Sequence, residues 1–323
     1  MNNNPKVSII IPAYNASGVI AEAIQSVQAQ TWQTWELIII NDGSTDNTDD
    51  VVNQYLNDPR IIYFKQENKG CSAAKNTGLA LASGQFIQYL DADDFLSPDK
   101  INEQVSVLNN DPWAVAVCRT KTFVNTISEP NLPEIDTNFL HDSNKPLEFV
   151  LNLYGLNGKE GMIQPNAFLI SSELAREAGI WDTALSPSPD EDGEYFCRVM
   201  LKSKSIYFTP NGINYYRKNA FSASLSKQTS HLHAKGALRS LEKKAEHLWQ
   251  EENSERVAQV IAKQYAGFIY LYHKLFPDLT NQAEFEISQL RLKRIPLVGG
   301  KNFQRMAKLI GFKNALILKK LVG

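Results

Sequence analysis

The 323-residue sequence has only three cysteines and lacks any apolar run long enough for a transmembrane helix. The cysteines, Cys71, Cys118 and Cys197, are odd in number and far apart, which argues against a disulfide framework and fits a reducing compartment. There is no C-x-x-C or H-E-x-x-H spacing to indicate a zinc site. The first residues also lack the pattern of a signal peptide. These absences predict a cytoplasmic protein.

The basic residues are unevenly distributed along the chain. Residues 291–323 hold nine Lys and Arg and no acidic residue. Removing these nine from the total of 33 basic residues leaves 24 against 35 acidic ones, so residues 1–290 carry about −11 and the tail +9. The net charge of −2 therefore hides two parts of opposite sign, which suggests two separate functions.

Buried strands and amphipathic helices alternate in the first hundred residues. Short β-branched runs predict strands at 6–12, 36–40, 61–64 and 85–90. Apolar residues at helical spacing predict helices at 17–28, around 51–55, at 73–82 and from 97 onward. This rhythm is typical of an α/β fold with a mostly parallel sheet flanked by helices.

The rest of the chain is less regular. We expect loops over 119–160 with a helix near 147–153, strands at 167–170, 206–209 and 213–217, and a helix at 191–200. From about 230 the pattern is helical. This places a domain boundary near 228, with a catalytic domain at 1–228 and a helical C-terminal region at 229–323.

Polar clusters follow three of the predicted strands. Tyr14-Asn15 follows the first, Asp42 the second, and Asp91-Ala-Asp-Asp94 the fourth. In parallel sheets, ligands bind beyond the carboxyl ends of the strands, so these side chains are expected to meet in one crevice. The spacing D-x-D presents two hard oxygen ligands suited to Mg²⁺ or Mn²⁺. Taken alone, the pattern favours the alternative, an Asp-rich turn that caps the next helix.

Asp190-Glu191-Asp192 begins another predicted helix. Acidic residues are favoured there by the helix dipole, and a general base is the alternative interpretation. Taken alone, the pattern favours the first.

Together these segments resemble the family 2 glycosyltransferases of the GT-A fold. The resemblance rests on seven pieces in order: Val7 to Asn15, Trp35 to Asp46, Glu67 to Gly78, Leu90 to Asp94, Gly179 to Asp182, Glu191-Asp192 with Arg198, and Tyr216-Arg217 with Ser224 to Ser226. It covers roughly residues 6–226. Two positions depart from the pattern: Lys75 stands where the family usually has arginine, and Lys218-Asn219 stands where many members carry a histidine.

The resemblance implies an inverting, metal-assisted transfer of a sugar from a nucleoside diphosphate, with a UDP-sugar preferred as donor. A hexosyl- or N-acetylhexosaminyl-type transferase is expected. Residues matching the family motifs would bind the donor (Pro12, Ala13, Tyr14, Asn15, Asp42, Lys75 and Asp91). Asp93 and Asp91 would hold Mn²⁺ or Mg²⁺, with Asp93 the more direct ligand, and Asp192 would be the catalytic base.

The acceptor is expected to be a saccharide or a lipid-linked hydroxyl in cell-surface polysaccharide or glycan assembly, with no nucleic-acid partner. Two other functions remain open: a nucleotidyltransferase and a non-catalytic sugar-nucleotide-binding protein. The first loop, Pro12-Ala-Tyr-Asn15, lacks the glycine-rich phosphate loop usual in nucleotidyltransferases.

Residues 301–322 place apolar side chains among lysines and arginines, interrupted at Gly311. This is typical of an amphipathic basic helix on an anionic membrane surface. A helix packed against the acidic body is the alternative. The protein is thus expected in the cytoplasm, at the inner face of the membrane if the first interpretation holds.

Overall fold

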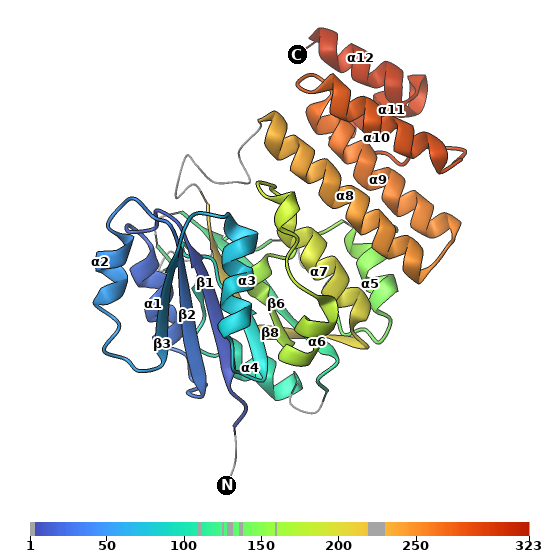
Figure 1. Cartoon of the computed structure of the whole chain (residues 1–323). Coiled ribbons are helices and arrows are strands. Elements are labelled where there is room, and N and C mark those ends of the chain that lie inside the picture. Colours follow the sequence, from blue (N-terminus) through green and yellow to red (C-terminus); the bar gives the residue numbers. More distant parts are fainter. Residues whose placement is uncertain are drawn as a thin grey trace.

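A computed structural model describes residues 4–108, 111–124, 126–127, 132–135, 138–158, 160–218 and 230–322. Within them, eight strands form one sheet in the order β3-β2-β1-β4-β7-β6-β8-β5. Helices cover both faces of the sheet, and further helices extend the chain beyond one end of it (Figure 1). The α/β fold with a C-terminal helical region is confirmed.

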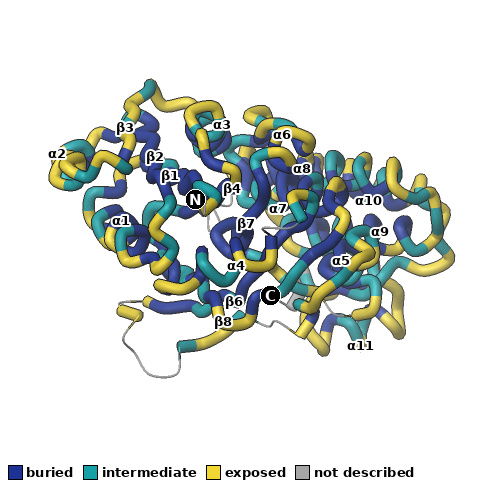
Figure 2. The backbone as a smooth tube through the Cα atoms, turned by 90° about the horizontal axis from the view of Figure 1, so that it is seen from below, coloured by how far each residue is buried: buried dark blue, intermediate teal, exposed yellow. Residues whose placement is uncertain are grey.

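The first half of the sheet is parallel, as predicted. It contains β1 (Val7–Ala13), β2 (Trp35–Asp42), β3 (Ile61–Gln66) and β4 (Phe86–Tyr89). These strands alternate with α1 (Ile20–Gln28), α2 (Thr48–Asn53) and α3 (Cys71–Leu81), and α4 (Lys100–Leu108) follows. The isoleucines of β1 and β2 are fully buried because helices cover them on both faces, and Figure 2 shows these strands in the buried interior. The predicted start of α4 was wrong by two to three residues.

The second half of the sheet is mixed. It contains β5 (Phe95–Leu96), β6 (Ala114–Phe123), β7 (Phe168–Ser171) and β8 (Ser205–Arg217), with antiparallel β4–β7, β7–β6 and β8–β5 pairs and a parallel β6–β8 pair. The expectation of loops from 119 was wrong for 119–123, which continue β6. The two strands expected at 206–209 and 213–217 are one strand, in which residues 210–212 shift the register against Cys118 and Arg119.

The helices of this half flank the same sheet. They are α5 (Pro146–Leu153), α6 (Ser172–Ala178) and α7 (Glu191–Lys202), with 3-10 turns η1 (Pro165–Ala167) and η2 (Thr183–Leu185). The helices predicted near 147–153 and at 191–200 are therefore confirmed.

The two halves of the sheet meet where β4 pairs with β7, over only two residue pairs. Buried polar side chains bridge this junction. The ammonium of Lys100 donates to Gln88 and to the Phe168 carbonyl, 3.2 Å away, and the Gln88 amide donates to the Asn166 carbonyl at 2.9 Å. Burial lowers the pKa of Lys100 to about 7.

The C-terminal region is helical, as predicted. It contains α8 (His231–Glu251), α9 (Glu255–Tyr272), α10 (Pro277–Gln289), α11 (Lys301–Ile310) and α12 (Phe312–Val322). The expected boundary at 228 falls outside the described residues. None of the helices in the described part of the chain is long and apolar enough to cross a membrane.

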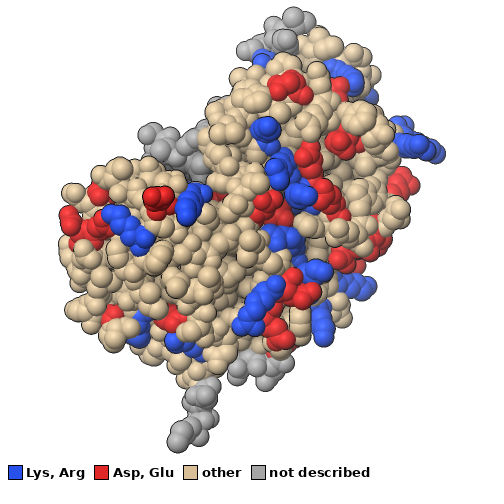
Figure 3. Space-filling view, viewed as in Figure 1, with Lys and Arg blue, Asp and Glu red and all other residues tan. Residues whose placement is uncertain are grey.

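The basic tail forms α11 and α12, separated at Gly311, which has a φ of +84°. Phe303 packs edge-on against Tyr270 of α9, and Lys319 lies 3.4 Å over the same tyrosine ring. Lys313 pairs with Glu284 of α10 at 2.7 Å. One side of the tail therefore packs on the body, as the alternative interpretation expected. On the face seen in Figure 3, basic and acidic side chains intermingle over the helical region, although α11 and α12 contribute no acidic side chain to it.

Helix α3 lies unusually close to β1 at Gly78. A Cβ placed on Gly78 would lie 2.3 Å from Cγ2 of Ile10, whereas one on Gly267 of α9 would meet nothing within 4 Å. We expect Gly78→Ala to lower the free energy of unfolding by about 1–3 kcal/mol through overpacking. The matched Gly267→Ala should raise it by about 0.5–1 kcal/mol. Urea unfolding monitored by circular dichroism measures both, and equal effects would contradict the close approach.

Candidate active site

The loop that follows β1 is tied to the loop that follows β2. Pro12 and Ala13 end the strand, Tyr14 is exposed, and Asn15 has a left-handed φ of +49°. The Asn15 side-chain oxygen accepts a hydrogen bond from the Thr45 backbone at 2.8 Å. Asparagine tolerates this conformation better than most residues. The four residues predicted to border the donor therefore lie at the carboxyl edge of the sheet.

Asp42 ends β2 and is buried. Its carboxylate accepts hydrogen bonds from the Gln66 side chain at 2.7 Å and from the backbones of Lys69 at 3.0 Å and Gly70 at 2.8 Å. Gly70 is the N-cap residue of α3 and has a φ of +89°. Asp42 thus holds the start of α3 against β2. A carboxylate offers about four acceptor positions, so one is left for a ligand.

Lys75 of α3 is a buried cation among acidic groups. Its Nζ lies 4.1 Å from the centroid of the Trp181 ring. Burial lowers the pKa of Lys75, but the neighbouring Cys71, Asp91, Glu191 and Asp192 raise it by more, so the net shift is upward. The side chain stays protonated at neutral pH. None of the ion pairs found in the described part of the chain includes this ammonium.

The turn after β4 is held by Asp94 rather than by the D-x-D pair itself. The buried Asp94 carboxylate accepts from the Arg217 backbone at 2.8 Å and from the Asn166 side chain. The Arg217 Nε also donates to the Asp93 carbonyl at 3.0 Å. The role of Asn166 could not be predicted from the sequence, because a single buried asparagine belongs to no recognisable pattern.

Asp91 and Asp93 are half-buried on this turn. Burial and the Asp91 charge raise the pKa of Asp93 to about 6. Two adjacent carboxylates that repel each other fit a divalent cation, which relieves the repulsion. Among the described residues, no group of three or more His, Cys, Asp or Glu side chains is arranged to hold a metal ion.

Asp192 is the second residue of α7 and is half-buried. Burial raises the pKa of Asp192 to about 6; Lys75 opposes this shift, and the charges of Asp190, Asp91 and Glu191 add to it. The neighbouring Glu191 accepts a hydrogen bond from Ser72 of α3 at 2.8 Å. The start of α7 therefore lies against α3, and Asp192 lies close enough to Lys75 and Asp91 to interact with both.

Trp181 and Cys71 are packing residues. Trp181 is fully buried, stacked on Tyr195 with ring centroids 4.1 Å apart and edge-on to Tyr89 at 5.0 Å. It has no exposed face on which a sugar could stack. Burial raises the pKa of the Cys71 thiol, which makes it a poor nucleophile.

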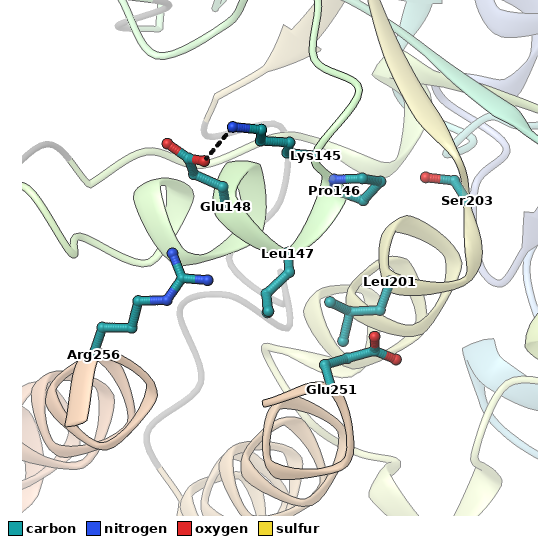
Figure 4. Close-up of a pocket in the computed structure, with 8 residues that line it drawn as sticks. All are labelled: Lys145, Pro146, Leu147, Glu148, Leu201, Ser203, Glu251 and Arg256. Atoms are coloured by element: carbon teal, nitrogen blue, oxygen red, sulfur yellow. Dashed lines mark ion pairs between the residues drawn. The ribbon is translucent and has the colours of Figure 1, made fainter. Parts of the chain in front are cut away.

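Two surface pockets lie away from the acidic residues at the carboxyl edge of the sheet. One, of about 300 Å³, is lined by α5, the end of α7 and the facing ends of α8 and α9 (Figure 4). Its Lys145 and Glu148 pair at 3.9 Å, and its Leu201 is at the opposite end of α7 from Asp192. The other, of about 580 Å³, lies near the amino ends of β1 and β4. The acidic cluster at the carboxyl edge is the better candidate, because charge and perturbed pKa values converge there.

This sheet, with acidic side chains at its carboxyl edge and a helical C-terminal region, defines a glycosyltransferase domain of the GT-A fold. Residues 8–177 match the family model described as glycosyl transferase family 2, just over half of the chain. The chain belongs to this family, and the predicted resemblance is confirmed.

Curated relatives are also described as glycosyltransferases. An uncharacterised glycosyltransferase of Rickettsia typhi is 31% identical over 207 residues, which cover 64% of this chain and 61% of the relative. The uncharacterised glycosyltransferase YibD of Escherichia coli is 39% identical over 119 residues, 36% of this chain and 35% of the relative. The chain thus matches about three fifths of the length of the first relative and about a third of the second.

Solved structures share the fold over nearly the whole chain. The crystal structure of S. aureus TarS residues 1–349 with UDP-GlcNAc superposes with a TM-score of 0.71 at 18% identity, covering 98% of this chain and 90% of that one. A mannosyltransferase of Pyrobaculum calidifontis, in complex with GDP-Man and Mn²⁺, has a TM-score of 0.54 at 14% identity, covering 99% and 88%. These similarities extend over the helical region as well as the sheet.

The raised pKa of Asp93 predicts a pH-dependent penalty on folding. The carboxyl pKa rises from 3.8 to about 6, so the folded state binds more protons between these values, and stability falls as pH rises through this window. Without divalent ions, Asp93→Asn should be more stable than the parent by about 1–2 kcal/mol above pH 6, with little difference near pH 4. Urea unfolding across pH 4–8 measures this.

The exposed carboxylate of Asp50 on α2 provides the matched control. Asp50→Asn should leave the pH profile of the parent unchanged. A constant difference between Asp93→Asn and the parent from pH 4 to 8 would rule out the raised pKa.

Proposed function

We propose that this protein is an inverting glycosyltransferase that moves a sugar from a nucleoside diphosphate, a UDP-sugar by preference, to a hydroxyl group. The observation that carries the proposal is the buried ammonium of Lys75 at the carboxyl edge of the sheet, where the charges of Asp91, Glu191 and Asp192 surround it. The UDP-GlcNAc bound to TarS and the GDP-Man and Mn²⁺ bound to the mannosyltransferase support a nucleotide-sugar donor. A hexosyl or N-acetylhexosaminyl group is the sugar expected.

The donor half is formed by the parallel strands. Pro12, Ala13 and Tyr14 would border the nucleobase, with Asn15 next to them on the same loop. Asp42 would hold the base by accepting a hydrogen bond from its imide or from the ribose. Lys75 offers a positive charge to the diphosphate, as a point charge rather than the two-pronged contact of an arginine.

The carboxylates of Asp91 and Asp93 would hold Mn²⁺ or Mg²⁺. A divalent ion bound there stabilises the negative charge of the departing diphosphate, so no acid is needed to protonate it. The charge of Asp91 raises the pKa of Asp93, so the two carboxylates lie close enough together to share one ion.

The acceptor half provides the base. Asp192, with a pKa of about 6, is largely ionised at neutral pH yet more basic than an ordinary carboxylate. It takes the proton from the acceptor hydroxyl as that oxygen attacks the anomeric carbon opposite the diphosphate. A single displacement of this kind inverts the anomeric configuration.

We expect Asp192→Asn to leave donor affinity nearly intact and to reduce transfer about a hundredfold or more, since a positioned base contributes roughly 10²–10⁴ in rate. Calorimetry with UDP-sugars and Mn²⁺ measures affinity, and release of the nucleoside diphosphate measures turnover. Asp50→Asn serves as the control for removal of a distant carboxylate. Near-normal turnover in Asp192→Asn would eliminate this base.

The same assay separates the alternatives. A glycosyltransferase releases the nucleoside diphosphate, whereas a nucleotidyltransferase releases pyrophosphate. A non-catalytic binding protein would release neither, even with a panel of saccharide and lipid-linked acceptors.

The tail at 291–323 supports a second part of the proposal, attachment to an anionic membrane surface at the cytoplasmic face, where a lipid-linked acceptor in cell-surface polysaccharide assembly would be found. Lys301, Arg305 and Lys308 recur at helical spacing on α11 and are exposed. Leu309 is 85% and Ile317 58% exposed. Exposed apolar side chains beside cations are what a headgroup boundary accommodates.

Replacing Lys301, Arg305 and Lys308 with glutamine should lower, at least severalfold, the fraction of the protein that sediments with vesicles of phosphatidylglycerol and phosphatidylcholine. The reason is that each cation near an anionic surface contributes about 1 kcal/mol to binding. The control neutralises Lys202, Lys204 and Lys235, which are exposed outside the tail. Equal sedimentation of the two triple variants would show that the tail only packs on the body.

A further inference from the structure

Helix α8 runs along the first turns of α7 and the loop before it (Figure 1). Its Gly236 approaches that loop so closely that a Cβ would lie 2.6 Å from the Leu185 carbonyl oxygen. His247 lies 3.0 Å from Glu194, one turn into α7. Between these two points, Ser240 and Lys244 contact Asp190. The four α8 residues recur at spacings of four, four and three, so they lie on one face of the helix.

Asp190 is the N-cap residue of α7, but its carboxylate does not cap that helix. Instead, the Lys244 ammonium donates to Asp190 Oδ2 at 2.5 Å. The Ser240 hydroxyl lies 2.8 Å from the same oxygen and 2.8 Å from the Asp190 carbonyl oxygen. Lys244 is itself 4% exposed, so this ion pair is shielded from water on the lysine side.

Gly193, in the first turn of α7, leaves room for this arrangement. A Cβ on Gly193 would lie 2.1 Å from Asp190 Oδ1, so a larger residue would displace the Asp190 carboxylate. The orientation of Asp190 is therefore determined from both sides, by its own helix and by α8.

We propose that Ser240 and Lys244 are positioning residues that act through Asp190 to fix the first turn of α7, and with it Asp192. The proposal rests on the proposed function, in which Asp192 is the base. Asp192 follows Asp190 by two residues on the same turn, so a shift of the N-cap moves the carboxylate relative to the acceptor. The helical region at 230–322 is thereby part of the catalytic apparatus.

The experiment compares Lys244→Met with Lys243→Met in the full-length chain. Methionine keeps the length of the lysine side chain but removes its charge. Lys243 is next to Lys244 and pairs with Glu246 of its own helix at 2.8 Å, so it provides the matched control. Turnover is normalised to the number of sites that bind the nucleotide with Mn²⁺, so that partial unfolding does not enter kcat.

Lys244→Met should lower kcat about tenfold or more, with the donor KM within about twofold of the parent, because small displacements of a reacting group are costly to rate. Lys243→Met should match the parent. Lys244→Arg should restore most of kcat, since it can pair with Asp190 again. If Lys244→Met does not fold, Ser240→Ala, which removes the shared hydroxyl, takes its place with a smaller loss of kcat.

An unchanged kcat in Lys244→Met or its substitute overturns the positioning role, as does an equal loss in Lys243→Met. The Asp192→Asn variant, measured in the same assay, distinguishes a failure of the positioning role from a failure of the proposed function. If Asp192→Asn loses transfer while Lys244→Met does not, the base stands and the positioning role falls.

Discussion

The placement of a buried ammonium among carboxylates is the constraint around which this site is organised. Lys75 has to be brought out of water at a point where α3, the end of β4 and the start of α7 meet, and only the acidic groups there keep it charged. Each of those acidic groups is in turn costly to bury without the cation. The charges of Lys75 and its acidic neighbours therefore favour the meeting of these three elements, in addition to their apolar packing. Trp181, beneath the ammonium, supplies the apolar part of the same contact.

At neutral pH, two carboxylates of the site lower the stability of the folded protein. Asp93 and Asp192 both have a raised pKa in the folded protein, which means that folding works against their ionisation. A purely structural cluster would pair each carboxylate with its own cation, as Asp190 is paired with Lys244. Asp93 and Asp192 lie where a divalent cation and an acceptor hydroxyl are proposed to bind, and at a binding site such a cost in stability is functional.

The sequence predicted the parallel half of the sheet well because each of its strands is a short β-branched run bounded by polar turns. It also placed Asp42, Asp91 and Asp93 at the ends of strands, where the structure has them. It missed β5 and most of β6, since a two-residue strand has no periodicity and Ala114–Phe123 was assigned in part to loops. The bonds from Arg217 and Asn166 to the D-x-D turn could not be predicted, because they join residues more than 70 positions apart without a local pattern. The contact of α8 with Asp190 could not be predicted either, because Ser240 and Lys244 lie 50 or more positions from Asp190.

The narrow junction between β4 and β7 has a consequence for how the two halves of the sheet find their alignment. Only two residue pairs of backbone ladder join β4 to β7, so the ladder alone constrains the alignment of the two halves little. The bridge from Lys100 through Gln88 to the carbonyls of Phe168 and Asn166 is different, since a slip of one residue would leave an ammonium and an amide without partners in a dry interior. A wrong alignment of the two halves of the sheet is thus disfavoured by the polar groups that it would leave unsatisfied, rather than by a loss of buried area. The polar bridge therefore fixes how the two halves of the sheet align, and with that alignment the relative positions of the side chains that each half contributes to the carboxyl edge.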